Sequence, residues 1–99
     1  MMVKRKPGDP LLPASEAAAR LTSLNGWTKK GKEIRKVFEF PDFVRAMAFV
    51  NAVALLAQRA NHHPDIDIRW NRVTLVLSTH SAGGLTTKDF DLADRIEEL

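Results

Sequence analysis

Asn61-His62-His63-Pro64 stands immediately before an alternating segment, DIDIRWNRVTLVL at residues 65–77, which ends at Ser78-Thr79-His80. Apolar residues occupy every second position on either side of Asn71-Arg72, as expected for two half-buried β-strands. A two-residue turn at Asn71-Arg72 places six apolar side chains on one face of a β-hairpin. The predicted pairs are Trp70 with Val73, Ile68 with Leu75, and Ile66 with Leu77.

The same pairing brings the histidines to one end of the hairpin. Extended beyond the strands, it sets His63 near His80 and His62 next to Ser81. Because proline restricts the preceding residue to extended backbone, the helix before the histidine pair must end there. Histidine is the side chain that ordinarily titrates nearest neutral pH, so the convergence of three predicts a proton-transfer site. We expect Asp89, near the loop after His80, to orient an imidazole or accept a ligand N–H.

The rest of the chain predicts three helices and a second hairpin. Helices are expected over residues 14–24, over residues 42–60, and after Thr86 or Thr87; strands are expected from Trp27 and over residues 33–40. The buried face of the last helix is predicted to contain Leu92, Ala93, Ile96 and Leu99. The order α-β-β-α-β-β-α predicts an α+β fold, with a four-stranded antiparallel sheet and three helices packed on one face.

The helix predicted over residues 42–60 carries an apolar stripe of about 160°, wider than that of many surface helices. Such a helix either covers the sheet and also contacts a second subunit, or is a well-buried core helix. The stripe contains Phe43, Ala46, Met47, Phe49, Val50, Val53, Ala54, Ala57 and Ala60.

Length and composition predict one domain over residues 13–99, preceded by a flexible tail over residues 1–12. The 99 residues include 44% hydrophobic and 27% charged residues and no cysteine, which excludes disulfides and thiolate chemistry. No run approaches the length of a membrane span, so we expect a cytoplasmic protein without a membrane partner. The net charge of +3 is dispersed, so we expect no direct nucleic-acid partner either.

The sequence alone leaves other interpretations of the three histidines open. Each histidine can be an isolated cap, turn or surface residue. Three imidazoles can also hold zinc, although neighbouring histidines on extended backbone point apart, which disfavours joint ligation by His62 and His63. A hydrolase using Ser78 or Ser81 is disfavoured because no nucleophile elbow surrounds either serine.

From Leu12 to Leu99 the chain closely resembles the pterin-4a-carbinolamine dehydratase family, also known as a dimerization cofactor of a homeodomain transcription factor. The resemblance rests on Gly26-Trp27, residues 43–51, Asn61-His62-His63-Pro64, Ser78-Thr79-His80, and Gly83-Gly84-Leu85-Thr86 with Asp89. Two departures are visible. Gln58 stands where many members have an acidic residue, and Trp70 stands where tyrosine is common.

The resemblance implies dehydration of a 4a-hydroxytetrahydropterin to a quinonoid dihydropterin in tetrahydrobiopterin recycling, with no cofactor and no metal. It assigns His62 and His80 to acid/base transfer, His63 chiefly to positioning, and Asp89 to orienting the group. It implies pterin binding by Gln58, Pro64 and Trp70 and by the segment Thr79, His80, Ser81 and Ala82, together with the histidine pair. It further implies a homodimer or homotetramer that serves an aromatic amino acid hydroxylase. The alternative is a non-catalytic module for protein binding or assembly, such as a transcriptional coactivator or an assembly chaperone.

Overall fold

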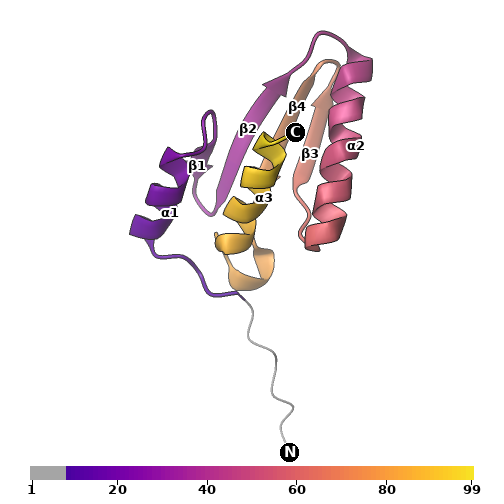
Figure 1. The fold of residues 1–99 in the computed structure, drawn as a ribbon. Coiled ribbons are helices and arrows are strands. Elements are labelled where there is room, and N and C mark those ends of the chain that lie inside the picture. The colour runs from indigo at the N-terminus through magenta and orange to yellow at the C-terminus, as the bar shows by residue number, and fades with distance from the viewer. Residues whose placement is uncertain (1–8) are drawn as a thin grey trace, which may run out of the picture.

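The computed structural model describes residues 9–99, which form three α-helices, a four-stranded sheet and one short 3-10 helix (Figure 1). In chain order the elements are α1 (Ala14–Thr22), β1 (Thr28–Lys30), β2 (Glu33–Glu39), α2 (Phe43–Ala60), β3 (Asp65–Arg69), β4 (Arg72–Leu77), η1 (His80–Ala82) and α3 (Thr87–Glu97). This order confirms the predicted α+β arrangement, and η1 is an addition that the sequence did not predict.

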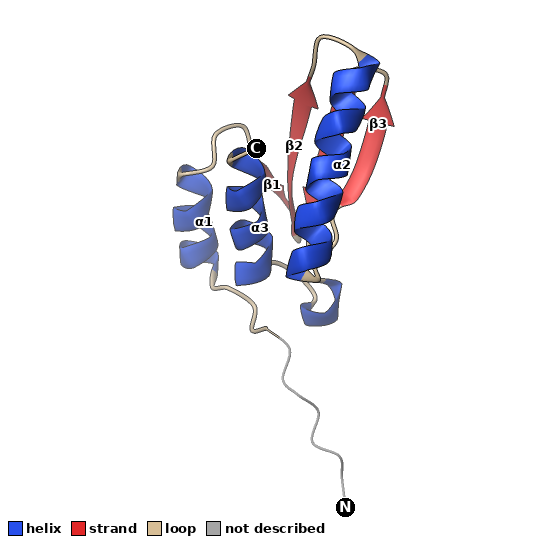
Figure 2. Ribbon diagram, turned by 45° about the vertical axis from the view of Figure 1, so that its right-hand side comes forward, coloured by secondary structure: helices blue, strands red, loops and turns tan. Residues whose placement is uncertain are grey.

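The sheet is antiparallel throughout, with the strand order β1-β2-β4-β3. The three helices lie in one layer on one face of this sheet, with α3 between α1 and α2 (Figures 1 and 2). Between the two layers is a core of central-strand and α3 side chains that solvent hardly reaches. Its largest members are Ile34, Val73, Leu75, Leu77, Phe90, Leu92 and Ile96.

The β3–β4 hairpin has a different register from the predicted one. Ile68 lies opposite Val73 and Ile66 opposite Leu75, so the predicted pairing of Ile68 with Leu75 is wrong by two residues. Because side chains alternate along a strand, a shift of two residues keeps the same face toward the core. The alternating pattern therefore fixes the face but leaves two registers that satisfy it equally.

The turn explains the shift. Trp70 was predicted on the apolar face of a strand, but it occupies the turn with φ of +51° and is 68% exposed. Asn71 holds the turn, because its side-chain amide donates to the Phe40 carbonyl at 2.8 Å and its own carbonyl accepts from the Phe40 N–H at 2.9 Å. These bonds tie the turn to the end of β2, at the opposite end of the hairpin from His63.

Only part of the apolar stripe of α2 is buried, which argues against the alternative of a well-buried core helix. Ala46, Val53 and Ala57 are buried, and the exposed members of the stripe are Phe43, Ala54 and Ala60. Outside the stripe, Val44 is 75% and Leu55 71% exposed. The contacts of α2 with α3 and β4 therefore leave part of its apolar surface in solvent.

By length and hydropathy alone, α2 also meets the criterion for a membrane-spanning helix. The expectation that no run approaches that length is therefore corrected. In the structure the helix packs against α3 and β4 as part of the domain.

Residues 1–8 of the predicted tail lie outside the described part of the chain, whereas residues 9–12 lie against the domain. The Leu12 N–H donates to the Leu85 carbonyl at 3.0 Å, and Asp9 pairs with Lys88 at 3.0 Å. At the other end, Leu99 was predicted in the buried face of the last helix, but it lies beyond α3 and is exposed.

Candidate active site

The end of α2 aims His62. Asn61 adopts the left-handed conformation with φ of +51°, and its N–H bonds to the Gln58 carbonyl at 3.2 Å. The next N–H, that of His62, returns to the Ala57 carbonyl at 3.1 Å. These two bonds form a Schellman motif, in which asparagine is the most tolerated residue after glycine. The chain therefore leaves the helix in a fixed direction, and His62 lies next to α3 rather than in solvent.

His62 is paired with a buried carboxylate. Its Nε2 lies 2.6 Å from Oδ1 of Asp89, and the two side chains are 10% and 0% exposed. A carboxylate bound to one ring nitrogen fixes the plane and the tautomer of an imidazole. The second nitrogen, Nδ1, is then the one left for exchange with a ligand.

Asp89 is itself held by three donors. Beyond His62, its Oδ2 accepts from Thr79 Oγ1 at 2.8 Å and from the Thr86 N–H at 2.9 Å. Thr86 caps α3 by accepting from the Lys88 N–H at 3.2 Å, and the Thr79 and Thr86 hydroxyls are 2.8 Å apart. Thr86 and Asp89 thus form a capping box, so a single carboxylate both caps α3 and orients His62.

His80 is presented by a short closed loop. Thr79 and Gly84 form an isolated bridge, with the Thr79 N–H donating to the Gly84 carbonyl at 2.9 Å. Between them lies η1, which ends at Gly83 with φ of +79°. The loop therefore holds His80 at the surface beside a buried Thr79.

The three histidines line one cavity of about 290 Å³, which we call the histidine cavity. Its lining residues are Asn61, His62, His63, Ser78, Thr79, His80, Ser81 and Lys88. The predicted convergence therefore exists in the structure. The register explains why His62 meets Thr79 rather than Ser81: continued past the strand ends, the observed pairing is shifted by two residues from the predicted one.

Several residues with predicted roles lie outside this lining. Gln58 contacts the site indirectly, since its Oε1 lies 3.4 Å from Nε2 of His63. Pro64 and Ala82 adjoin lining residues in the chain without lining the cavity, and Asp89 lies behind His62. Trp70 is separated from His63 by the length of β3, about 16 Å of extended chain, so this chain does not bring it to the histidines.

Reasoning from the sequence gave no role in the site to four participants: Asn61, Ser78 and Lys88, which line the cavity, and Thr86. Thr86 had a usable signal, because Thr-x-x-Asp at residues 86–89 has the spacing of a capping box. No sequence signal indicated Lys88, because its position at the cavity depends on how α3 is rotated against α2. Within residues 9–99, no set of three or more histidine and carboxylate side chains has an arrangement suited to a metal ion.

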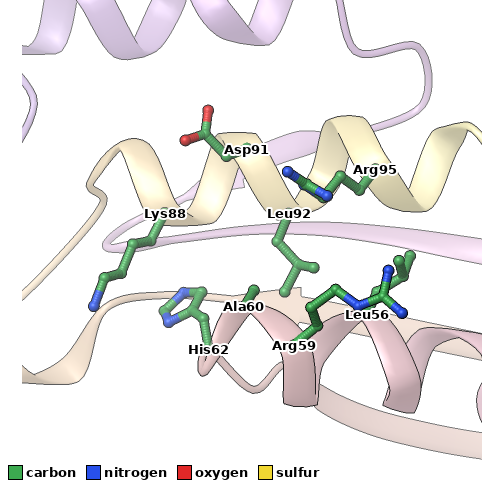
Figure 3. A pocket seen from close by; sticks show the side chains of 8 residues that line it. All are labelled: Leu56, Arg59, Ala60, His62, Lys88, Asp91, Leu92 and Arg95. Atoms are coloured by element: carbon green, nitrogen blue, oxygen red, sulfur yellow. The ribbon is translucent and has the colours of Figure 1, made fainter.

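A second pocket shares His62 and Lys88 with the histidine cavity. This interhelical pocket, of about 260 Å³, runs between α2 and α3 (Figure 3). It is lined by Leu56, Arg59, Ala60, His62, Lys88, Asp91, Leu92 and Arg95. His62 is therefore reached from two sides.

Known proteins are similar to this chain in sequence and in fold. Residues 10–99 match the family described as "Pterin 4 alpha carbinolamine dehydratase". A Roseiflexus castenholzii protein named "Putative pterin-4-alpha-carbinolamine dehydratase" is 62% identical over 89 residues, which cover 90% of this chain and 96% of that protein. An Acidobacterium capsulatum protein of the same name is 64% identical over 80 residues, covering 81% of this chain and 87% of that one.

Among solved structures, a Brucella melitensis "transcriptional coactivator/pterin dehydratase" superimposes with a TM-score of 0.86 and 36% identity, covering 89% of this chain and 96% of that one. A pterin dehydratase-like RuBisCO assembly factor shares the fold, with a TM-score of 0.60 and 23% identity over 73% of this chain and 83% of its own. Because the family model and these relatives match most of its length, the chain belongs to the pterin-4-alpha-carbinolamine dehydratase family.

Proposed function

We propose that the protein is a 4a-hydroxytetrahydropterin dehydratase that uses histidine acid/base catalysis. The observation that carries the proposal is the histidine cavity, which all three histidines line and in which His62 is held by the buried Asp89. Family membership supports the same reaction. A protein with no chemistry to perform has no physical need for an oriented imidazole beside two others.

The reaction removes a hydroxyl group from C4a and a proton from N5 of the pterin. Hydroxide is a poor leaving group, so an acid must protonate it as the C4a–O bond breaks. The N5–H proton passes to a base, and the electron pair it leaves forms the C4a=N5 bond of the quinonoid product. Water and the dihydropterin are then released, and the proton taken from N5 balances the one given to the hydroxyl.

We assign these transfers to His62 and His80 and positioning of the ring to His63. His62 has Nδ1 available because Asp89 occupies Nε2. His80 stands on a separate loop, so the two imidazoles can act on different faces of the ring. Backbone groups of the loop from Thr79 to Ala82 are proposed to bind the pterin, with Gln58 acting through His63.

The test is a metal-free dehydration assay with purified protein and a chelator. We expect the absorbance change from the 4a-carbinolamine to the quinonoid form to be accelerated well above the buffer rate. His62→Ala and His80→Ala should each lower the rate by about 10²-fold or more, the usual contribution of a positioned acid or base. Lys30→Ala, on exposed β1, is the control. A wild-type rate equal to the buffer rate rules out the proposal.

The exposed apolar surface of α2 favours a second function in protein association. Val44 and Leu55 lie largely in solvent, and a homo-oligomer or a partner protein would cover them. We propose first that the protein associates with itself to form a dimer or a tetramer. The alternative is a module for protein binding or assembly, the roles that the names of the Brucella coactivator and the RuBisCO assembly factor describe for those proteins. Partner binding that survives loss of all three histidines, in a protein without dehydratase activity, would favour the module.

We also propose the setting that the reaction implies. The enzyme would need no cofactor, act in the cytoplasm and recycle tetrahydrobiopterin beside an aromatic amino acid hydroxylase. Co-purification or coupled turnover with such a hydroxylase tests this setting.

A further inference from the structure

The interhelical pocket next to His62 is lined by three cationic side chains over an apolar floor. Arg59 comes from α2, Lys88 and Arg95 come from α3, and Leu56 and Leu92 supply the floor. Figure 3 shows Lys88 beside His62 at one end of the pocket, with the two arginines farther along it. The proposed reaction at C4a and N5 makes no use of these arginines.

The one carboxylate in the lining does not neutralise them. Asp91 is paired with Arg20 of α1 at 3.0 Å, and in Figure 3 its carboxylate points away from the gap between α2 and α3. Lys88 is paired with Asp9 at 3.0 Å. Across residues 9–99, neither Arg59 nor Arg95 has an ion-pair partner. The guanidinium groups of Arg59 and Arg95 are therefore not held by a short ion pair, although Arg95 also borders a neighbouring pocket with Asp91, Asp94 and Glu98.

We propose that this pocket binds an anionic group, a phosphate or a carboxylate, at the end of the C6 side chain of the substrate. The inference rests on the proposed function, because the position of C6 follows from the reacting atoms. C6 is bonded to N5 and lies two bonds from C4a, so a substituent on it begins within a few ångströms of the imidazoles that act there. His62 and Lys88 line both cavities, so the interhelical pocket adjoins the place where that substituent begins.

The dimensions agree with a side chain of this length. Arg59 precedes His62 by about one helical turn, roughly 5 Å along α2, and Arg95 follows Lys88 by about two turns, roughly 10 Å along α3. A three-carbon side chain ending in phosphate spans about 6 Å, and the arginine side chains close the remaining distance. Guanidinium groups suit this role because they bind planar or tetrahedral oxyanions through two parallel N–H donors.

The experiment measures binding to the full chain, independently of turnover. Isothermal titration calorimetry compares three stable 7,8-dihydropterins whose C6 propyl chains end in a hydroxyl, a phosphate ester or a carboxylate, with inorganic phosphate as a fourth probe. We expect at least one anionic ligand to bind about tenfold tighter than the alcohol, the effect of one charge-assisted hydrogen bond. Whichever anion gains more identifies the natural group.

The double variant Arg59→Gln/Arg95→Gln should bring the anionic and neutral ligands to equal affinity. The control Arg45→Gln/Arg72→Gln changes the net charge equally at exposed positions of α2 and β4, and should keep the preference. Equal affinity of all three ligands for the wild type overturns the inference, and so does a preference that survives the loss of both arginines.

The outcomes separate this inference from the proposed function. Dehydration of a neutral substrate without any anion preference rejects the inference and keeps the enzyme. Anion preference without dehydration rejects the enzyme and keeps a binding site for an anionic pterin. Tight binding of inorganic phosphate alone, with no gain for the pterin ester, shows that the pocket does not serve the pterin side chain and overturns the inference.

Discussion

Replacing Asp89 with asparagine should damage stability and catalysis together. The side chain is fully buried, and both of its oxygens accept hydrogen bonds, from His62, Thr79 and the Thr86 N–H. Asparagine keeps the shape but turns one acceptor into an NH₂ donor. Facing Thr79 and Thr86 it meets donors, and facing His62 it makes Nε2 the acceptor and moves the ring proton to Nδ1. Since a hydrogen bond to a charged group contributes about 1.5–3 kcal/mol, we expect the free energy of unfolding to fall by about 2–3 kcal/mol.

For a domain of this size, each kcal/mol corresponds to about 4–8 °C in Tm, so Tm should fall by about 10–20 °C. The dehydration rate should fall by about 10²-fold, measured well below the new Tm, because His62 loses the partner that fixes its tautomer. Differential scanning calorimetry and the dehydration assay give the two numbers.

Asp94→Asn is the matched control, since Asp94 is also an α3 aspartate in a 3.0 Å ion pair, but its side chain is 49% exposed. An exposed ion pair contributes at most about 1 kcal/mol, so this variant should stay near wild type in stability and rate. An Asp89→Asn protein as stable and as active as Asp94→Asn would refute the assignment of Asp89 as the shared support of α3 and His62.

Three further changes test the end of α2, the turn of the β3–β4 hairpin and the buried network around Asp89. Asn61→Gly should leave the free energy of unfolding nearly unchanged, whereas Asn61→Ala should lower it by about 1 kcal/mol in urea titrations, because alanine is strained at a φ of +51°. Trp70→Gly should preserve the dehydration rate and should be at least as stable as the wild type, because the residue lies in a positive-φ turn away from the histidines. A strong loss of activity would contradict that placement. Thr79→Val should cost about 1–2 kcal/mol of unfolding free energy and lower turnover, because it removes the hydroxyl that donates to Asp89; unchanged thermal melting would speak against the buried network.

The element order was predictable because each element carries its own local signal. Alternating apolar residues predicted the strands, and the proline after His63 predicted where α2 ends. The register of β3 against β4 was not predictable from the sequence, because two registers that differ by two residues bury the same face. The choice between them depends on Trp70 accepting a positive φ, which bulky residues seldom do, and on Asn71 bonding to Phe40 of β2.

The candidate site was predictable to the extent that the hairpin determines it. The histidines could be brought together from strand pairing alone, and Asp89 could be placed in the first turn of the last helix. The short contact between His62 and Asp89 could not be predicted from the sequence, because it depends on how α2 and α3 pack. The same reason hides the interhelical pocket: Arg59 and Arg95 are ordinary exposed arginines until the two helices are set side by side.

The double duty of Asp89 limits what can be read from its presence in relatives. A protein of this fold that abandoned pterin chemistry would still need a carboxylate to cap α3 and to satisfy Thr79 and Thr86. Selection for folding alone would therefore retain this aspartate. Retention of Asp89 alone does not distinguish an active dehydratase from a relative recruited to another task. The His80 backbone accepts from Gly83, but its imidazole has no hydrogen bond within residues 9–99, so the imidazole is the better marker of surviving activity.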